Sequence, residues 1–109
     1  MDATLGALAE PNRLRIVEYL RGGPRSVNQI VEELRLPQPL VSKHLRVLKD
    51  AGLVEVHPNA QRRVYQLQAR TFKELSSWVA TFRRIWEDRL DTLDDYLQEE
   101  KERQRHNRK

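Results

Sequence analysis

Apolar side chains recur every three or four residues over most of the chain, which is the spacing of helices that bury one side. A first such helix is predicted from Pro11, well placed in a first turn, to the glycine pair at 22–23. Its expected buried face consists of Leu14, Ile16, Val17 and Leu20. A short apolar segment, "LGALA", precedes it.

The next two helices are separated by very few residues. Ser26 followed by Gln29 predicts a capping box that opens one helix, and Pro37 closes it. The following helix begins at Gln38 and ends at Gly52. Its expected buried arc is formed by Val41, Leu45 and Leu48, flanked by Leu40 and Val47. His44 lies near that arc, which favours a partly buried histidine with satisfied hydrogen bonds over a base-reading one.

The hydrophobic pattern changes after Gly52. Two short β-prone runs, "LVEV" and "VYQL", surround the polar segment "HPNAQ" and predict a β-hairpin. From Arg70 to Gln104 the chain has no Gly or Pro, and one long helix is expected there. The basic end "RQRHNRK" is expected to be frayed or disordered.

Two helices separated by a short turn and followed directly by a hairpin form a winged helix-turn-helix. The predicted fold class is therefore mainly α, with a small β-hairpin wing and a long C-terminal dimerisation helix. The expected division is a winged domain at residues 1–68, the long helix at 69–104 and a tail at 105–109.

Composition narrows the class further. The 109 residues carry a formal net charge of +4, which permits a polyanionic partner. There is no cysteine, so disulfides and thiolate metal sites are excluded. The sequence lacks an apolar run long enough to cross a bilayer and the features of a signal peptide. A soluble cytoplasmic protein without membrane association is expected.

The polar side of the helix that begins at Gln38 is the candidate nucleic-acid surface. Six basic and two acidic residues lie between positions 35 and 63, and an adjacent basic pair is expected at the hairpin tip. Major-groove readout needs such donors and acceptors near a helix N-terminus, and a wing reaches flanking phosphates. The alternative is an ordinary solvated helix face. The candidate residues are Gln38, Pro39, Ser42, Lys43 and Arg46 on the helix, with Arg62 and Arg63 on the wing.

An apolar stripe on the final helix predicts self-association. A small domain cannot cover both this stripe and the apolar N-terminus, whereas a second copy buries them with two-fold symmetry. The alternative is a helix that folds back on its own domain. The expected interface residues are Leu5, Leu8, Phe72, Leu75, Val79, Phe82 and Trp86. Beyond Glu87 the helix becomes acidic, and we expect that part to project away from DNA.

Four segments together resemble the ArsR-type winged-helix transcriptional repressors: "LAEPNRLRIVEYL", "VNQIVEEL", "QPLVSKHLRVLKDAGLV" and "RRVYQL". The resemblance covers about Leu5 to Leu67. It implies a homodimer that binds palindromic operator DNA and represses transcription, with members of similar layout looking like autorepressors. Gln38, Ser42 and Lys43 match the family's reading helix, and the basic pair matches its wing. Pro37 departs from the Ser or Thr cap of many members.

A second departure concerns metal sensing. Metal-responsive members place thiols at the start of the helix that here begins "SVNQIV", where Ser26 and Asn28 cannot form a soft thiolate site. The family's other metal site uses Asp and His pairs on the last helix. That helix offers Asp88, Asp91, Asp94 and Asp95, but only the distant His106. We predict no regulatory metal and no other cofactor, and the sequence does not identify a small-molecule effector.

The leading hypothesis is a dimeric, sequence-specific repressor that binds operators overlapping promoters and so blocks transcription. The promoter of its own gene is expected to be among them. The second is a winged-helix protein-interaction module without specific DNA binding. An enzyme is not predicted, because the chain has no Gly-rich phosphate loop and no Ser, His and acid set at recognisable spacing. Its three histidines, at 44, 57 and 106, are scattered.

Overall fold

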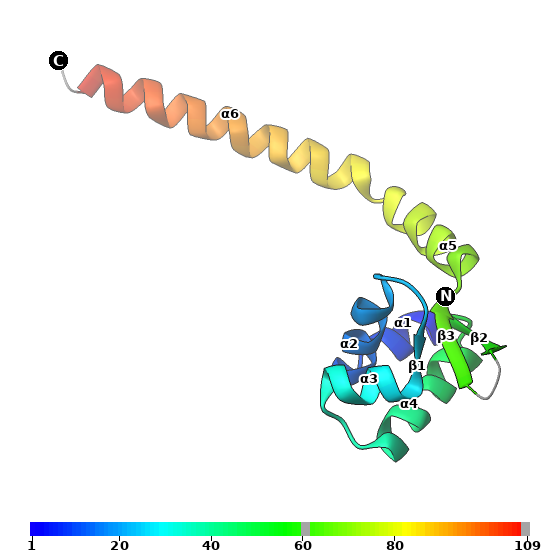
Figure 1. Ribbon diagram of the computed structural model, residues 1–109. Coiled ribbons are helices and arrows are strands. Elements are labelled where there is room, and N and C mark those ends of the chain that lie inside the picture. The colour runs from blue at the N-terminus through cyan, green and yellow to red at the C-terminus, as the bar shows by residue number, and fades with distance from the viewer. Residues whose placement is uncertain (60–61, 108–109) are drawn as a thin grey trace. The chain divides into compact units, whose positions relative to one another are not determined.

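The computed structural model describes residues 1–59 and 62–107 (Figure 1). Helices dominate, and the three strands form one antiparallel sheet in the order β1-β3-β2. This arrangement confirms the predicted winged helix-turn-helix class. The elements in chain order are α1 (Asp2–Leu8), α2 (Pro11–Leu20), β1 (Arg25–Ser26), α3 (Val27–Leu34), α4 (Gln38–Asp50), β2 (Val54–Asn59), β3 (Arg62–Leu67), α5 (Ala69–Ala80) and α6 (Arg83–Asn107).

The predicted helix starts rest on local hydrogen bonds. Pro11 opens α2, and the Glu10 carboxylate before it accepts the Arg13 N–H at 2.7 Å. At α3 the Gln29 N–H donates to Ser26 Oγ at 3.2 Å, and the Ser26 N–H donates to Gln29 Oε1 at 2.8 Å. The predicted capping box is therefore present. Each of these bonds satisfies a backbone donor that a helix start would otherwise leave free.

The turn between α3 and α4 and the end of α4 both use the left-handed backbone region. Arg35 ends α3 with φ 55°, and its N–H donates to the Val31 carbonyl at 2.9 Å. Gly52 follows α4 with φ 77°, as the predicted helix end requires. At the start of α4 the N-cap is Pro37, which has no side chain able to cap.

The core of residues 1–74 lies between α2, α3, α4 and the start of the wing. Leu14 is 46% exposed, so its prediction as a buried residue was wrong. The buried arc predicted for α4 is confirmed, because its three residues are 0% exposed. The buried apolar side chains are Ala7, Ile16, Val17, Leu20, Ile30, Val41, Leu45, Leu48, Leu53 and Val54.

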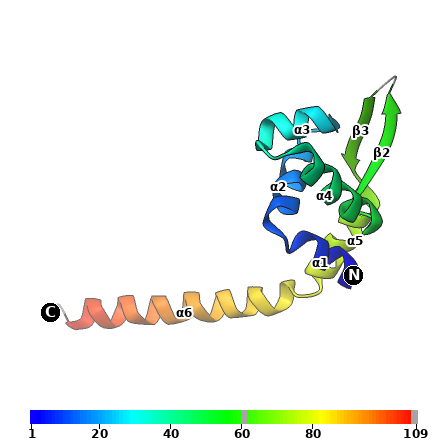
Figure 2. The same ribbon diagram turned by 90° about the horizontal axis from the view of Figure 1, so that it is seen from below.

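The wing is a hairpin of two six-residue strands whose register runs from Val54 opposite Leu67 to Asn59 opposite Arg62. The predicted turn "HPNAQ" was too long, because its first three residues belong to β2; Ala60 and Gln61 lie outside the described residues. Figure 2 shows the hairpin extending outward next to α3 and α4. The sequence did not predict β1, whose two residues pair with Tyr65 and Val64.

The single long helix predicted from Arg70 to Gln104 is two helices, α5 and α6, separated at Thr81 and Phe82. The carbonyl of Trp78 accepts both the Thr81 N–H, at 3.1 Å, and the Thr81 hydroxyl, at 2.7 Å. This local bonding competes with the regular helical pattern and tightens the backbone there.

By compactness the chain forms two units: the winged unit, Met1–Glu74, and the C-terminal unit, Leu75–Lys109. The boundary predicted after residue 68 lies at the start of α5, at Ala69, and not at the division between the two units after Glu74. The tail expected to be disordered from residue 105 is helical through Asn107, and residues 108–109 lie outside the described chain. Among the helices of residues 1–59 and 62–107, none is both long and apolar enough to cross a membrane.

Candidate nucleic-acid interface

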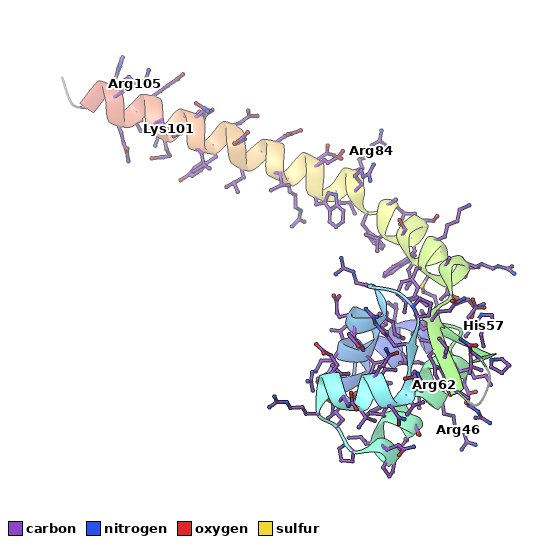
Figure 3. The ribbon with its side chains drawn as sticks, viewed as in Figure 1. Arg46, His57, Arg62, Arg84, Lys101 and Arg105 are labelled. Carbon is purple, nitrogen blue, oxygen red and sulfur yellow. The ribbon has the colours of Figure 1, made fainter. Side chains whose placement is uncertain are left out.

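Helix α4 separates its side chains into a buried arc and an exposed polar side. All five candidate residues on this helix are exposed, from its first turn to its middle. Arg46 of α4 and Arg62 of β3 both project outward from the winged unit (Figure 3). The five α4 residues are Gln38, Pro39, Ser42, Lys43 and Arg46.

A hollow of about 640 Å³ lies between α4 and the wing. Among the described residues that line it, four are basic and Asp50 is the one acid. The hollow brings Arg63 of the wing together with the five candidates from α4. Its lining is Val27, Gln38, Pro39, Ser42, Lys43, Arg46, Lys49, Asp50, Arg63 and Tyr65.

Arg62 does not line this hollow. Side chains alternate along a strand, so Arg63 and Tyr65 share one face of β3 whereas Arg62 and Gln66 share the other. The alternation could have indicated Tyr65 from the sequence, since it lies two residues from Arg63. Val27, the first residue of α3, had no comparable signal, because its place beside the hollow depends on how elements distant in sequence pack together.

The wing face that carries Arg62 also holds a small polar cluster. Gln66 Nε2 donates to Glu55 Oε1 at 2.6 Å, and His57 Nε2 lies 3.4 Å from the same oxygen. The Gln66 hydrogen bond, followed by the one from His57, holds the pKa of Glu55 below its ordinary value. His57 lies within β2, opposite Val64, and not in the hairpin turn where the sequence pattern had placed it.

Behind the exposed side of α4, His44 is buried at 7% exposure, as its phase on the helix predicted. Arg13 Nη1 donates to its Nδ1 at 3.5 Å, and Glu10 Oε2 lies 3.7 Å from its Nε2. Arg13 Nε also donates to the carbonyl of Ala7 at 2.7 Å. These contacts connect α4 to α2 and to the end of α1.

Glu10 is anionic at neutral pH for a local reason. The backbone N–H of Arg13 stabilises its carboxylate and lowers the pKa of Glu10. The N–H of Asn12 and the electrostatic influence of His44 and Arg13 also lower this pKa. Burial raises it, but by less than the first hydrogen bond lowers it. The acid thus serves both as the cap of α2 and as a neighbour of His44.

The residues predicted to form a dimer interface are exposed or half-buried in each unit. In the winged unit Leu5 is 38% exposed, and Leu8 and Phe72 are half-buried. In the C-terminal unit Leu75 is half-buried, while Val79, Phe82 and Trp86 are more than 40% exposed. Trp78 packs edge-to-face on Phe82, with ring centroids 5.1 Å apart. The assignment of these residues to a dimer stays a prediction.

Within residues 1–59 and 62–107, no group of three His, Cys, Asp or Glu side chains is placed to hold a metal ion. The Ser26 hydroxyl, at the position where the family's metal sensors carry thiols, is engaged in the cap of α3. The absence of a regulatory metal remains a prediction from the sequence.

The helix pair α3–α4, followed by the β2–β3 hairpin of a three-stranded antiparallel sheet, defines a winged helix-turn-helix protein. The family described as "Bacterial regulatory protein, arsR family" matches residues 10–56. The uncharacterized HTH-type transcriptional regulator MJ1325 of Methanocaldococcus jannaschii is 36% identical over 74 residues, which cover 67% of this chain and 83% of that protein. The chain belongs to the ArsR family. Membership in a family of regulatory proteins agrees with the prediction that it is not an enzyme.

Two further relatives give the scale of the similarity. The transcriptional repressor SmtB of Mycobacterium tuberculosis is 46% identical over 63 residues, which cover 58% of this chain and 47% of SmtB. The chain thus spans about half the length of that relative. The solution structure of the homodimeric DNA-binding domain of Mycobacterium bovis Mb0332, described as a possible ArsR-family regulator, is 32% identical. Its similarity covers 74% of this chain and 78% of that domain, with a TM-score of 0.62.

Proposed function

We propose that this protein is a transcriptional repressor that binds double-stranded DNA sequence-specifically as a homodimer. The observation that carries the proposal is the basic hollow between α4 and the wing. Lys43, Arg46, Lys49 and Arg63 gather there around a single acid among the described lining residues. Phosphate neutralisation by such side chains supplies most of the affinity of DNA-binding proteins.

The first two turns of α4 are the part that reads bases. Gln38 presents an amide that pairs bidentately with adenine, and Lys43 favours guanine or phosphate. Ser42 between them is short and exposed, so the helix approaches the groove floor closely. Arg46 and Lys49 follow toward the C-terminal end of α4 and contact the backbone, which positions the helix without specifying sequence.

The wing contributes through Arg63 more than through Arg62. Arg63 shares the hollow with α4 and so faces the same duplex. Arg62 lies on the opposite face of β3, away from the hollow, and contacts at most one flanking phosphate. Replacing Arg63 with alanine is therefore expected to weaken binding to all sequences and to reduce the salt slope by about one.

A two-fold dimer reads a palindrome whose half-sites are about one helical turn apart, roughly 34 Å. Leu5, Leu8, Phe72, Leu75, Val79, Phe82 and Trp86 form the proposed interface, supported by their exposure and by the homodimeric state of the Mb0332 domain. SmtB is named as a repressor, which supports repression over activation. The dimer would occupy an operator that overlaps a promoter and so exclude RNA polymerase from it. The promoter of the protein's own gene is included in this proposal.

The test is an anisotropy titration of the full chain against duplexes selected from a random library, with scrambled duplexes as competitors. We expect a palindromic consensus and a specific affinity at least a thousandfold above the nonspecific one. Equal, salt-sensitive affinity for both duplexes would sink specific DNA binding and favour the protein-interaction alternative. Duplex from upstream of the protein's own gene then tests self-regulation separately.

Variants sharpen the test. Gln38→Ala should relax preference at one base pair in each half-site, by about 1–3 kcal/mol. Arg63→Ala should lower the salt slope, whereas Arg62→Ala should change it less. Arg70→Ala, an exposed arginine of α5 that lies near Glu74, serves as the matched control and should leave the slope unchanged. Equal slopes for Arg63→Ala and the parent would show that the wing does not contact phosphate.

A further inference from the structure

Helix α6 carries an apolar seam that none of its own residues covers. Trp86, Leu90, Leu93 and Leu97 are spaced 4, 3 and 4 residues apart and are between 47% and 62% exposed. At about 100° per residue they fall within a narrow arc of the helix. Charged residues such as Arg84 and Arg105 project from other sides of α6 (Figure 3). The seam is therefore continuous along one side.

This spacing is the heptad spacing of a coiled coil. Leu90 and Leu97 occupy the a positions, and Trp86 and Leu93 occupy the d positions. The seam is roughly 17 Å long, at 1.5 Å per residue. It ends before Glu100, the next d position, whose carboxylate lies 3.2 Å from Arg103 Nη1. A helix so polar elsewhere gains little from folding alone, so the seam needs an occupant.

We propose that α6 pairs with α6 of a second copy as a parallel, in-register, two-stranded coiled coil. This inference deepens the homodimer of the proposed function, on which it rests for the second copy. The seam extends the apolar stripe of the proposed interface beyond Trp86. It lies outside residues 10–56, the part of the chain that the family model matches.

The charges beside the seam decide the orientation. In a parallel pair each g position faces the following e position of the other helix. Arg89 is a g residue and Asp94 is the next e residue, so Arg89 would face Asp94 of the partner subunit, twice by symmetry. In an antiparallel pair the e positions face each other instead. That arrangement would set Glu87 against Asp94 of the partner subunit, a repulsion that also occurs twice.

Cysteine cross-linking tests the orientation directly, because the chain contains no cysteine of its own. In the full-length protein, Leu97→Cys should form a covalent dimer under mild oxidation, since the two copies of an a residue meet in a parallel pair. Asp95→Cys, on the opposite side of α6, is the matched control and should cross-link far less. In an antiparallel pair Leu97→Cys would face Trp86 and stay unlinked, while mixed Leu90→Cys and Leu93→Cys proteins would link to each other.

The same samples separate the two levels of the hypothesis. If sedimentation shows a dimer but Leu97→Cys links no better than Asp95→Cys, the coiled coil is wrong and the homodimer stands. If the parent protein sediments as a monomer at all concentrations, both are wrong. A covalent dimer formed selectively through Leu97→Cys supports both.

Charge reversal gives a second measurement that leaves the seam intact. In the parallel arrangement Asp94→Arg should weaken dimerisation about three- to tenfold at low salt, because it sets arginine against arginine. Adding Arg89→Asp should restore most of the affinity. In the antiparallel arrangement Asp94→Arg would tighten the dimer by pairing with Glu87, and this outcome would overturn the proposal.

Discussion

The winged unit and the C-terminal unit treat their apolar side chains in opposite ways. In residues 1–74, seven large apolar side chains are less than 2% exposed, and they come from α2, α3, α4 and the start of the wing. In residues 75–109, every large apolar side chain from Trp78 to Leu97 is at least 39% exposed. The first unit buries a core of its own, although Leu5 and Leu14 stay exposed, whereas the second leaves these large apolar side chains exposed. The two units of one chain thus differ in how much of their own apolar surface each buries.

Truncating one leucine in each unit would give the largest contrast. Leu45→Ala removes a fully buried side chain and should lower the free energy of unfolding by about 2–5 kcal/mol. Leu93→Ala removes a side chain that is 52% exposed, and alanine favours helices at least as well. It should leave the stability of the winged unit unchanged and weaken self-association. Urea unfolding and sedimentation measure the two effects, and similar unfolding losses for both would erase the contrast.

Backbone conformation offers a smaller contrast within the winged unit. Gly52→Ala should destabilise it by about 1–2 kcal/mol, because φ is 77° there. The new methyl would meet Thr71 Oγ1 at an ordinary 3.5 Å, so the cost is conformational. Gly6→Ala is the control. It lies inside α1 with open space around it, and should stabilise by up to about 1 kcal/mol. A neutral Gly52→Ala would show that the end of α4 can relax.

A change of opposite sign is expected at the turn between α3 and α4. Arg35 adopts φ 55° although it carries a side chain. Arg35→Gly removes that strain, partly offset by the greater freedom of glycine in the unfolded chain, and should raise the unfolding free energy by about 0.5–1 kcal/mol. Thermal unfolding measures it. A loss of stability would mean that the arginine side chain makes a contribution larger than the strain.

The smallest effect concerns pH. The pKa of Glu10 is below its ordinary value of 4.5 in the folded protein, so ionisation of this acid favours folding above that value. This contribution disappears as the pH falls through the lowered pKa. Glu10→Gln should therefore have a lower melting temperature than the parent at pH 7, and the difference should shrink in acid. A difference that is constant from pH 7 to pH 3 would assign the effect to the amide and not to the charge.

Features set by neighbouring residues were predictable from the sequence. The Ser26–Gln29 box, Pro11 at the start of α2 and Gly52 after α4 depend on hydrogen bonds or dihedrals within a few positions. The break at Thr81 was missed because no Gly or Pro marks it. The hydroxyl that bonds the Trp78 carbonyl resembles that of Thr92, which bonds the Asp88 carbonyl without breaking α6.

The candidate site divides in the same way. The exposed side of α4 follows from helical phase, and so do the buried arc and His44. The sequence could not show which of Arg62 and Arg63 faces α4. Adjacent residues lie on opposite faces of a strand, and the face that turns toward α4 depends on how the wing packs. Leu14 has helical phase but is 46% exposed, because within the described residues of the winged unit no element packs over that part of α2 closely enough to bury it. These outcomes depend on partners distant in sequence.

The polar contacts of His44 with Arg13 and Glu10 have a consequence for α4, the helix proposed to read DNA. The hydrophobic effect and dispersion are non-directional, so they constrain small rotations of a helix about its own axis only weakly. Hydrogen bonds are directional, and a buried imidazole that loses them bears an unsatisfied polar group. Even a rotation of α4 that is small enough to keep its apolar arc buried would change the distances from His44 to Arg13 and Glu10. The rotational setting of α4, and with it the direction in which Gln38, Ser42 and Lys43 point in the proposed DNA interface, thus depends on contacts made on the buried side of the helix.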